Sequence, residues 1–386
     1  MLIYWLELKK LLSAVAVWGF IAACLLFNLV IIISNSGDEY GDFVGAVAQV
    51  TGYILDQSFA EKLSRLTVGG KPAEYLAQLK HETEGVTDVF EGYETRYIGE
   101  RYIQAMGATG YWADLMREKY AALQKVVEEK AKKDESLTLY FAGATYERHQ
   151  LLFDTLLGWL FTEGALAAVL LALLAVGYEN IYGTESLVYS TKKGRQVMGP
   201  KLAASLTAGL GTYILLAVPT FIAYFSVNKY GGIWGSSVSS LFNYRVDLIT
   251  GNRPFITWYS FSVLTYFLAM VGAGAILVLC FALLAFGIGM VVRNSYLAFL
   301  VFLLVNGVNI VVPLQMPQTL PIGLAIKYLS VLSPVGLWLK HGIWFTDGDV
   351  DVIWPYFETL GLGLSLVVLT VFCVSALIYF RKRDLT

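Results

Sequence analysis

The 386-residue sequence predicts an all-α, polytopic membrane protein with six transmembrane helices. Hydrophobic residues make up 56% of the chain and charged residues 15%, against roughly 25% charged in an average soluble domain. The mean hydropathy is +0.59. A bilayer core requires about 20 consecutive apolar residues of helix. Six stretches meet or approach that length: residues 11–33, 157–178, 202–226, 259–291, 295–312 and 357–380.

The positions of lysine and arginine predict how these helices are oriented. Cytoplasmic ends of membrane helices are enriched in Lys and Arg. All the basic clusters that flank the six stretches fall on one side if both termini are cytoplasmic. These clusters are Lys9 with Lys10, residues 192–201, Arg293, and residues 381–383. The first stretch, residues 11–33, is too long for the core of a signal peptide, so we expect an uncleaved membrane helix.

Residues 34–152 are expected to form an extracytoplasmic domain between the first two membrane helices. They carry 19 acidic and 13 basic side chains, more than half of all charged residues in the chain, which requires a surface in water. Apolar residues recur at three- and four-residue spacing from Tyr111 to about Lys133, which predicts an amphipathic helix. A second helix is expected from Pro72 to about Gly85. Residues 136–141 are expected as a short strand in this mainly helical domain.

The region 313–356 precedes the last membrane helix and is apolar enough to suggest a seventh span. A complete crossing would place the basic residues 381–383 on the outer side, against the charge rule. Pro334 also interrupts the region, and a crossing would bury Lys327, Lys340 and His341. We therefore expect a re-entrant hairpin of two half-helices that enters from the outer face and is covered by protein. The chain thus divides into residues 1–33, the outer domain 34–152, and residues 153–386.

The sequence contains no recognisable motif for nucleotide binding, metal binding or nucleophilic catalysis. A phosphate-binding loop reads GxxxxGK[ST], whereas residues 69–71 (GGK) are followed by Pro72. The pair His81-Glu82 lacks the second histidine of a zinc-binding HExxH helix, because residue 85 is Gly. No GxSxG nucleophile elbow is present, and a net charge of −2 gives no case for nucleic-acid binding. We expect no catalytic residue, metal site or bound cofactor, so a partner would supply the energy for any pumping.

We single out three side chains within the predicted membrane helices, Glu163, Asn306 and Asn309, because ionisable and amide groups there are costly and often functional. Glu163 is expected about one turn into the membrane, either solvated at the outer interface or lining a transport path. Asn306 and Asn309 are three residues apart and share one helix face. They are expected either to hydrogen-bond a neighbouring helix or to line the same path.

The loop of residues 179–201 differs from a plain connector. Acidic residues lie in its first part, and the sequence of residues 183–186 (GTES) indicates a turn that leads into a helix. Leu187, Val188 and Tyr189 then form an apolar ridge before the basic residues. We expect a short amphipathic helix that docks into a groove on a soluble partner. A simple positively charged loop and a contact with anionic lipid are the alternatives.

These features together resemble ABC-2 type permeases, the membrane subunits of ATP-driven exporters. In the loop, the resemblance lies in the order of Glu179, Gly183, Thr184, Leu187, Ser190, Thr191, Gly194, Arg195 and Lys201. Residues 287–295 (GIGMVVRNS) are similar to the family's tight inner turn between helices four and five. Residues 329–334 (LSVLSP) are similar to its outer re-entrant hairpin. The domain 34–152 resembles that of Gram-positive permeases that export peptides or give resistance to them.

The resemblance implies a six-helix half-transporter in a bacterial plasma membrane. Two permeases, identical or related, would pair with two ABC ATPase subunits that bind ATP and Mg²⁺. The assembly would export an amphipathic substrate such as a peptide, an antimicrobial or a lipid. The residues implied in coupling to the ATPase are Glu179, Gly183, Thr184, Glu185, Leu187, Val188, Tyr189, Thr191, Gly194, Arg195 and Lys201.

Two other classes of function stay open at this point. One is a secondary transporter driven by an ion gradient, which would need carboxylates or broken helices near the middle of the membrane. The other is a membrane-anchored sensor in which residues 34–152 bind a ligand.

Overall fold

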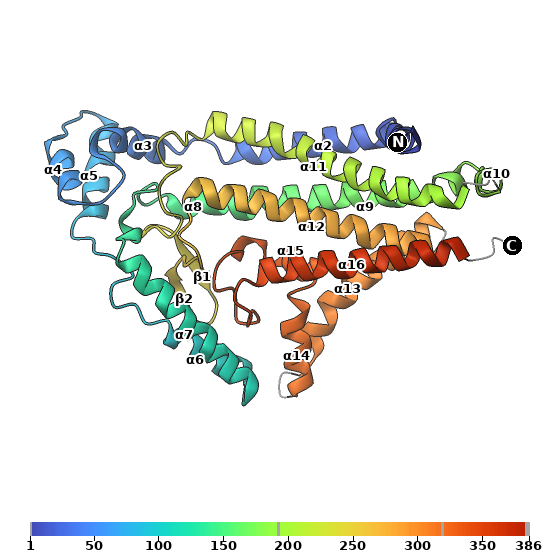
Figure 1. The fold of residues 1–386 in the computed structure, drawn as a ribbon. Coiled ribbons are helices and arrows are strands. Elements are labelled where there is room, and N and C mark those ends of the chain that lie inside the picture. The colour runs from blue at the N-terminus through green and yellow to red at the C-terminus, as the bar shows by residue number, and fades with distance from the viewer. Residues whose placement is uncertain (1, 191–193, 293, 318–319, 383–386) are drawn as a thin grey trace.

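The computed structural model describes residues 2–190, 194–292, 294–317 and 320–382, and it is mostly helical (Figure 1). Within these residues, six helical segments are long and apolar enough to cross a membrane, as the sequence predicts. They are α2 (Val15–Ser34), the segment Thr145–Ile181, α11 (Met198–Val227), α12 (Val263–Val292), α13 (Ser295–Gln315) and α16 (Phe357–Lys382). The protein is thus a multi-pass membrane protein by the length and composition of its helices.

The segment Thr145–Ile181 is one unbroken rod. It consists of α8 (Thr145–His149), a π-helical stretch (Gln150–Leu156) and α9 (Leu157–Ile181). Its 37 residues extend about 55 Å at 1.5 Å per residue, well beyond the thickness of a bilayer core. The helix therefore begins 12 residues before the expected start at residue 157.

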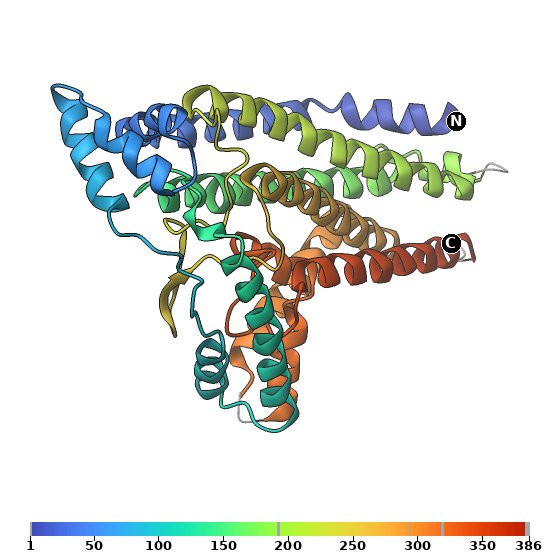
Figure 2. The same ribbon diagram turned by 60° about the vertical axis from the view of Figure 1, so that its left-hand side comes forward.

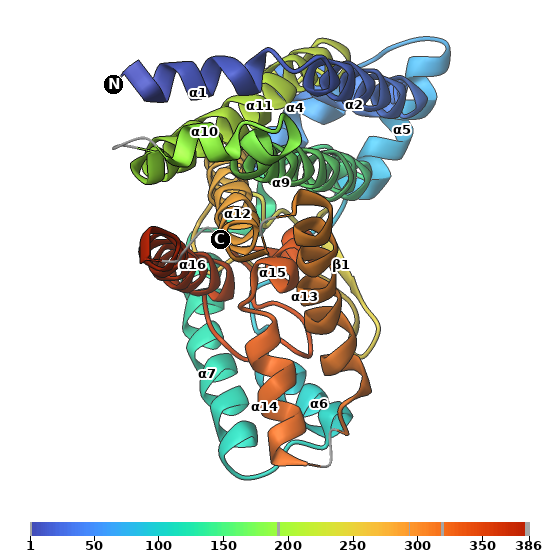
Figure 3. The same ribbon diagram turned by 90° about the vertical axis from the view of Figure 1, so that its right-hand side faces the viewer.

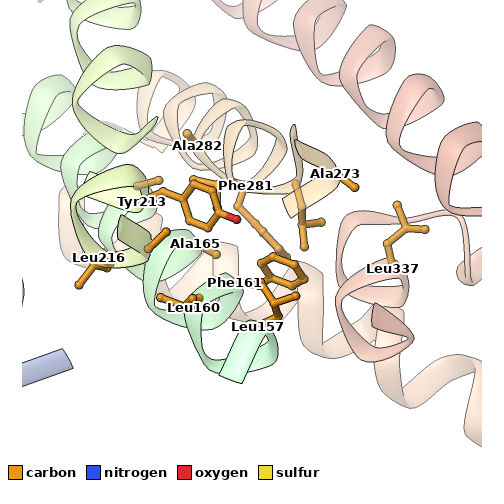
Figure 4. Close-up of a cluster of buried hydrophobic side chains, with 14 of the residues drawn as sticks. Leu157, Leu160, Phe161, Ala165, Tyr213, Leu216, Ala273, Phe281, Ala282 and Leu337 are labelled. Atoms are coloured by element: carbon orange, nitrogen blue, oxygen red, sulfur yellow. The ribbon is translucent and has the colours of Figure 1, made fainter. Parts of the chain in front are cut away.

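The rod is packed among the other membrane helices. Tyr213 of α11, Phe161 of α9 and Phe281 of α12 point into the space between these three helices (Figure 4). A Cβ atom on Gly164 of α9 would lie 2.8 Å from the Tyr213 ring, so only glycine permits this approach. A Cβ on Gly209 of α11 would similarly lie 2.8 Å from the Cβ of Ala168. Small residues thus let the helices pack closely, as is common between membrane helices.

The two ends of the helix bundle differ in what they carry. One end, here called the terminal end, carries the start of α1 (Leu2–Leu12), the end of α16 and α10 (Glu185–Tyr189) (Figure 1). The opposite end, here called the distal end, carries α3 (Glu39–Thr51), α4 (Gln57–Arg65) and α5 (Lys71–Thr83). It also carries α6 (Arg96–Met106), α7 (Tyr111–Ala131) and an antiparallel hairpin of β1 (Tyr244–Asp247) and β2 (Gly251–Pro254), in which Tyr244 faces Pro254. The helices expected at residues 72–85 and 111–133 are therefore confirmed as α5 and α7.

The short strand expected at residues 136–141 is wrong. Residues Glu135–Leu137 form a 3₁₀ helix, and Thr138 makes only an isolated bridge with Ile54. Side chains in this segment form local hydrogen bonds. The Ser136 hydroxyl donates to Asp88, and the Thr138 hydroxyl donates to the Glu135 carbonyl. A continuous ladder is therefore replaced by local side-chain bonds.

Residues 34–152 do not share one hydrophobic core. Helices α3 to α5 surround a cluster that includes Val44, Phe59 and Leu79. Helices α6 and α7 belong to a second cluster, which is completed by residues from far along the chain: Ile256, Trp258, Leu324, Tyr328 and Ile353. The second half of the expected domain thus depends on the segment between α11 and α12 and on the segment before α16.

The region before the last helix contains two short helices, as expected, but they do not lie together in the bundle. Helix α15 (Pro334–Leu339) packs against α9, α12 and α16, and Trp338 donates to Thr162 of α9 at 3.0 Å. Helix α14 (Pro321–Ser330) instead lies beside α6 and α7 (Figures 2 and 3). The rings of Tyr328 and Trp112 are 5.2 Å apart there. Only α15 thus has the position expected of a half-helix within the bundle.

Candidate functional site

The loop of residues 179–201 begins with a tight turn at the end of α9. Gly183 has φ +66°, a left-handed conformation that favours glycine. The N–H of Thr184 donates to the Glu179 carbonyl at 2.9 Å, and the N–H of Gly183 donates to the Asn180 carbonyl at 3.3 Å. This pair of bonds is a Schellman motif, which satisfies the last carbonyls of α9. The short helix expected in this loop follows at once as α10, with Glu185 as its first residue.

The three apolar residues of α10 do not form one exposed ridge. The Leu187 side chain is 70% exposed, Val188 is half-buried, and Tyr189 is only 8% exposed. The Tyr189 ring packs on Phe380 of α16, with ring centroids 5.4 Å apart. Successive helical residues are about 100° apart around the axis, so three consecutive side chains cannot share one face. The expected ridge is therefore wrong, and of the three side chains Leu187 alone faces outward.

The second half of the loop closes back onto α10. Gly194 begins a 3₁₀ helix (Gly194–Val197), and a Cβ on Gly194 would lie 2.0 Å from the Val188 carbonyl oxygen. Glu185 is half-buried and accepts a hydrogen bond from Asn180 at 3.3 Å. Thr191 and the Arg195 side chain, both expected to contribute to coupling, lie outside the described residues.

Glu179 and Lys201, expected as contacts for a partner, are instead buried beneath the loop. The Lys201 ammonium donates to Glu179 at 2.7 Å and to the Ala175 carbonyl at 2.7 Å, and it lies 3.3 Å from Glu7. Lys10 pairs with Glu7 at 2.7 Å and with Glu179 at 3.6 Å. We call these four residues, Glu7, Lys10, Glu179 and Lys201, the terminal cluster. It joins α1 (Leu2–Leu12) to α9 and α11.

The terminal cluster is balanced in charge, with two acids and two bases. Its most accessible member is Lys10, whose side chain is 34% exposed. Partial burial by itself lowers the pKa of Lys10, but the hydrogen bond and charge of Glu7 outweigh it, so the pKa is raised. Each buried carboxylate therefore has an ammonium partner at the terminal end.

Glu163 lies in a second buried group, here called the bundle cluster and consisting of Asn28, Glu163 and Thr220. Asn28 of α2 donates to Glu163 at 2.9 Å and to Thr220 of α11 at 3.3 Å. Glu163 is 5% exposed, because the α9 rod extends beyond it toward the distal end. Solvation of Glu163 at the interface, one of the two expectations, is therefore wrong.

Among the described residues of this chain, Asn306 and Asn309 of α13 hydrogen-bond no neighbouring helix. Each donates back to its own helix, to the carbonyls of Phe302 and Val305 at 2.8 and 3.1 Å. Asn309 borders a cavity of about 240 Å³ that is also lined by Lys327 of α14. The neighbouring-helix expectation is wrong, and a role for these two residues in a path stays a prediction.

A third group of buried charges holds the distal end together, and sequence reasoning missed it. Arg253 of β2 donates through two nitrogens to Asp347, at 2.9 and 2.8 Å, and Tyr120 of α7 donates to the same carboxylate at 2.8 Å. Arg245 of β1 lies 3.7 Å from Asp347, and Tyr102 of α6 donates to Asp247. We call these residues the distal network. Three segments of the chain meet in it.

Nearby positive charges and hydrogen bonds lower the pKa values of the two buried acids of the distal network, Asp347 and Asp247. Burial would raise the pKa of Asp347, but the nearby charges of Arg253, Arg245 and Lys119 lower it. Burial acts in the same way on Asp247, yet hydrogen bonds from Tyr102 and backbone N–H groups lower its pKa to about 2. Both acids are thus ionised at neutral pH. The signal in the sequence was the presence of charged residues in the two connectors, among them Arg245, Arg253 and Asp347.

Lys119 of α7 gives the distal end a pH dependence. Its ammonium is buried and donates to the Val352 carbonyl at 2.6 Å, and burial lowers the pKa of Lys119 to about 7 against the opposing charge of Asp347. Because a lysine in an unfolded chain titrates near 10.4, the unfolded state binds more protons between about pH 7 and pH 10. Burial of the Lys119 ammonium therefore destabilises the folded protein fully below pH 7. This loss of folding free energy is relieved as the pH rises from about 7 to about 10.

Lys119→Met is expected to flatten this rise of stability with pH, whose slope reaches at most about 1.4 kcal/mol per pH unit for one group. The measurement is the free energy of unfolding of the purified protein between pH 7 and pH 10. Lys125→Met is the matched control, because Lys125 is exposed on the same helix. An unchanged slope in Lys119→Met would contradict the prediction.

Among the described residues, no group of three His, Cys, Asp or Glu side chains is arranged to hold a metal ion. Comparisons with protein-family models, curated proteins and solved structures find no match for this chain. Its function is therefore inferred from its own helices, loop and buried clusters.

Proposed function

We propose that the chain is the membrane-spanning permease subunit of an ATP-driven ABC exporter, which moves an amphipathic peptide, antimicrobial or lipid. The observation that carries the proposal is the form of α10. It is a short helix that presents Leu187 outward and is fixed on both sides, by the Gly183 turn and by the contact of Gly194. A plain connector does not need a helix held in this way.

Charge favours a cytoplasmic position for α10. The terminal end carries Lys9, Lys10, Arg381 and Lys382, and such residues are enriched on the cytoplasmic side of membrane proteins. The distal end, with most of residues 34–152, would then face the outside of a bacterial plasma membrane. Arg293 and Arg383, which enter the same charge argument, lie outside the described residues.

In the proposed assembly, a groove on a soluble ATPase receives Leu187, with Glu185 and Arg195 as flanking charged contacts. Two ATPase subunits bind ATP and Mg²⁺, and a second permease, identical or related, completes the transporter. A force on α10 passes to α9 through the Gly183 turn and to α11 through the 3₁₀ helix Gly194–Val197. The Glu179–Lys201 pair joins the same two helices, so they move as one unit. The ATPase needs only to favour one helix arrangement over another by differential binding.

Leu187→Asp is expected to reduce substrate-stimulated ATP hydrolysis of the assembled complex by about tenfold or more. Burying one leucine contributes roughly 1.5–3 kcal/mol, and 1.4 kcal/mol is tenfold in affinity. The measurement is ATP hydrolysis by the complex that copurifies with the chain, reconstituted in lipid. Glu185→Lys combined with Arg195→Glu tests the flanking charges in the same assay.

Tyr296→Asp is the matched control for Leu187→Asp. Tyr296 is 86% exposed in the first turn of α13, where an acidic side chain is tolerated. Substrate-stimulated ATP hydrolysis in Leu187→Asp at the wild-type rate would contradict the proposal. Failure of any ATPase to copurify with the chain would contradict it equally.

One observation favours a second candidate, a secondary transporter driven by an ion gradient. Glu163 is a carboxyl group buried among α2, α9 and α11, and ionisable groups within a membrane bundle often mark ion pathways. Transport by the chain alone in liposomes, with an ion gradient and without ATPase, would support this candidate over the exporter.

A further inference from the structure

The bundle cluster differs from the terminal cluster and the distal network in having no cation. Glu179 has Lys201 and Asp347 has Arg253. Among the described residues, Glu163 is contacted by the neutral side chains of Asn28 and Cys24, and no charged group influences it. An unpaired carboxylate in a low-dielectric interior is strongly unfavourable. The surroundings of Glu163 therefore suit a neutral acid better than an ion.

A second buried acid shows what Glu163 lacks. Glu358 also has no cation among the described residues. It lies in the first turn of α16, where its Oε1 accepts a hydrogen bond from Thr359 at 3.0 Å while its Oε2 has no hydrogen-bond partner. The free N–H groups and the dipole of a helix N-terminus stabilise a carboxylate. Glu163 is the seventh residue of α9 within the unbroken rod, where the backbone N–H groups are bonded along the helix. Glu163 therefore receives no stabilisation from a helix N-terminus.

Asn28 supplies the complementary observation. Its side chain is 1% exposed, and its amide oxygen has no hydrogen-bond partner although its amide nitrogen has two. A buried acceptor without a donor costs about 1–3 kcal/mol. A carboxylic acid carries an O–H donor that a carboxylate lacks. A proton on Glu163 would thus remove the unpaired charge and offer a donor to this amide.

One cavity lies toward the distal end from the bundle cluster. It has a volume of about 360 Å³ and is lined by Asn35, Asp38, Glu147 and Asn228, among others. Asn35 follows Asn28 by seven residues, so it lies on the same face of the helix two turns further out, a distance of about 10 Å. Asn228, at the end of α11, follows Thr220 by eight residues. The cavity also contains Arg148, which pairs with Asp38 at 2.8 Å.

The helices around Glu163 present few other groups that titrate. Helix α2 offers Cys24, and neither α2 nor α12 contains a charged residue. The only charged residue of α11 is Lys201, which is 19 residues from Thr220 and is held in the terminal cluster; α11 also carries Tyr213 and Tyr224. Helix α9 itself carries Glu179 in the terminal cluster. A change of protonation within the bundle cluster therefore belongs to Glu163.

We propose that Asn28, Glu163 and Thr220 form a proton-binding site inside the helix bundle. Glu163 holds the proton at neutral pH while α2, α9 and α11 are packed together. Separation of these helices admits water, stabilises the carboxylate and releases the proton through the distal cavity. Opening of the bundle is thereby linked to proton release, whichever energy source drives transport.

The test is infrared difference spectroscopy of the purified full chain in phosphatidylcholine nanodiscs, titrated from pH 5 to pH 9 without ATPase. We expect a protonated carboxyl C=O band that persists at pH 7 and disappears in Glu163→Gln. Glu358→Gln is the matched control and should retain the band. A spectrum at pH 7 that is the same in wild type and Glu163→Gln would overturn the proposal. Failure of the exporter proposal would not affect this result, because no ATPase is present.

Two further experiments test the site if Glu163→Gln does not fold or if a cation other than a proton binds. If Glu163→Gln does not fold, Asn28→Leu leaves the carboxyl in place and should shift the band frequency, because the acid loses its hydrogen-bond partner. An unshifted band in Asn28→Leu would overturn the site. The titration is also run in sodium and in choline buffers. Loss of the band on addition of sodium would show that a metal cation occupies the site in place of a proton, and would equally overturn the proposal.

Discussion

Lys201→Met is expected to destabilise the folded protein by about 3–5 kcal/mol, the usual cost of removing one partner from a buried ion pair. Lys201 is fully buried between Glu7 and Glu179, and its removal leaves two buried carboxylates with only Lys10. Helices α1, α9 and α11 would then lose their common contact at the terminal end. The measurement is equilibrium unfolding of the purified protein in lipid or detergent.

Lys9→Met is the control for Lys201→Met, because Lys9 is exposed on α1 beside the terminal cluster. A surface substitution of this kind usually changes stability by less than about 0.5 kcal/mol. Adding Glu179→Gln to Lys201→Met should restore part of the lost stability, since it removes one of the unpaired charges. Equal stability of Lys201→Met and Lys9→Met would show that the terminal cluster does not hold these helices together.

Asp347→Asn is expected to loosen the distal end by a similar amount, about 3–5 kcal/mol. The asparagine amide would keep the shape of Asp347 but would place an N–H donor against the donors of Arg253 and would remove the charge that both arginines face. Because Tyr120 of α7 also bonds Asp347, the loss should spread to α6 and α7. Hydrogen exchange of the α6 and α7 amides measures this loosening.

Asp349→Asn is the control for Asp347→Asn. Asp349 belongs to the same loop and pairs with Lys340 and Arg245, but its side chain is 38% exposed. Solvent screening makes such a pair worth much less than a buried one. Exchange rates in α6 and α7 that rise equally in both variants would refute a special role for Asp347.

The sequence was sufficient for elements whose signal is local. The six apolar stretches, the amphipathic pattern of α7, Pro72 at the start of α5 and the GTES turn before α10 all predict what the structure contains. Each depends on residues within a few turns of one another. The ends of the helices were predicted less accurately. The start of the second membrane helix was placed at residue 157 by counting back from its end, whereas the helical segment begins at Thr145.

The buried clusters were beyond the reach of the sequence. A basic loop has the same pattern whether Lys201 points outward or, as here, inward to a carboxylate 22 residues away. Asp347 and Arg253 are 94 residues apart, and Asn28 and Glu163 are 135 apart, so only the packing of helices brings each pair together. The ridge at Leu187–Tyr189 failed for a different reason, because helix geometry divides three consecutive residues among different faces.

The unbroken rod Thr145–Ile181 acts mechanically as a lever. It is about 55 Å long and contains no proline, and its π-helical stretch, Gln150–Leu156, lies near its distal end. Its terminal end carries the turn into α10, and its distal end borders the 360 Å³ cavity through Arg148. A tilt of about 10° around its middle would displace each end by about 5 Å, in opposite directions. A small push at one membrane surface thus becomes a side-chain-sized displacement at the other, without any change inside the helix itself.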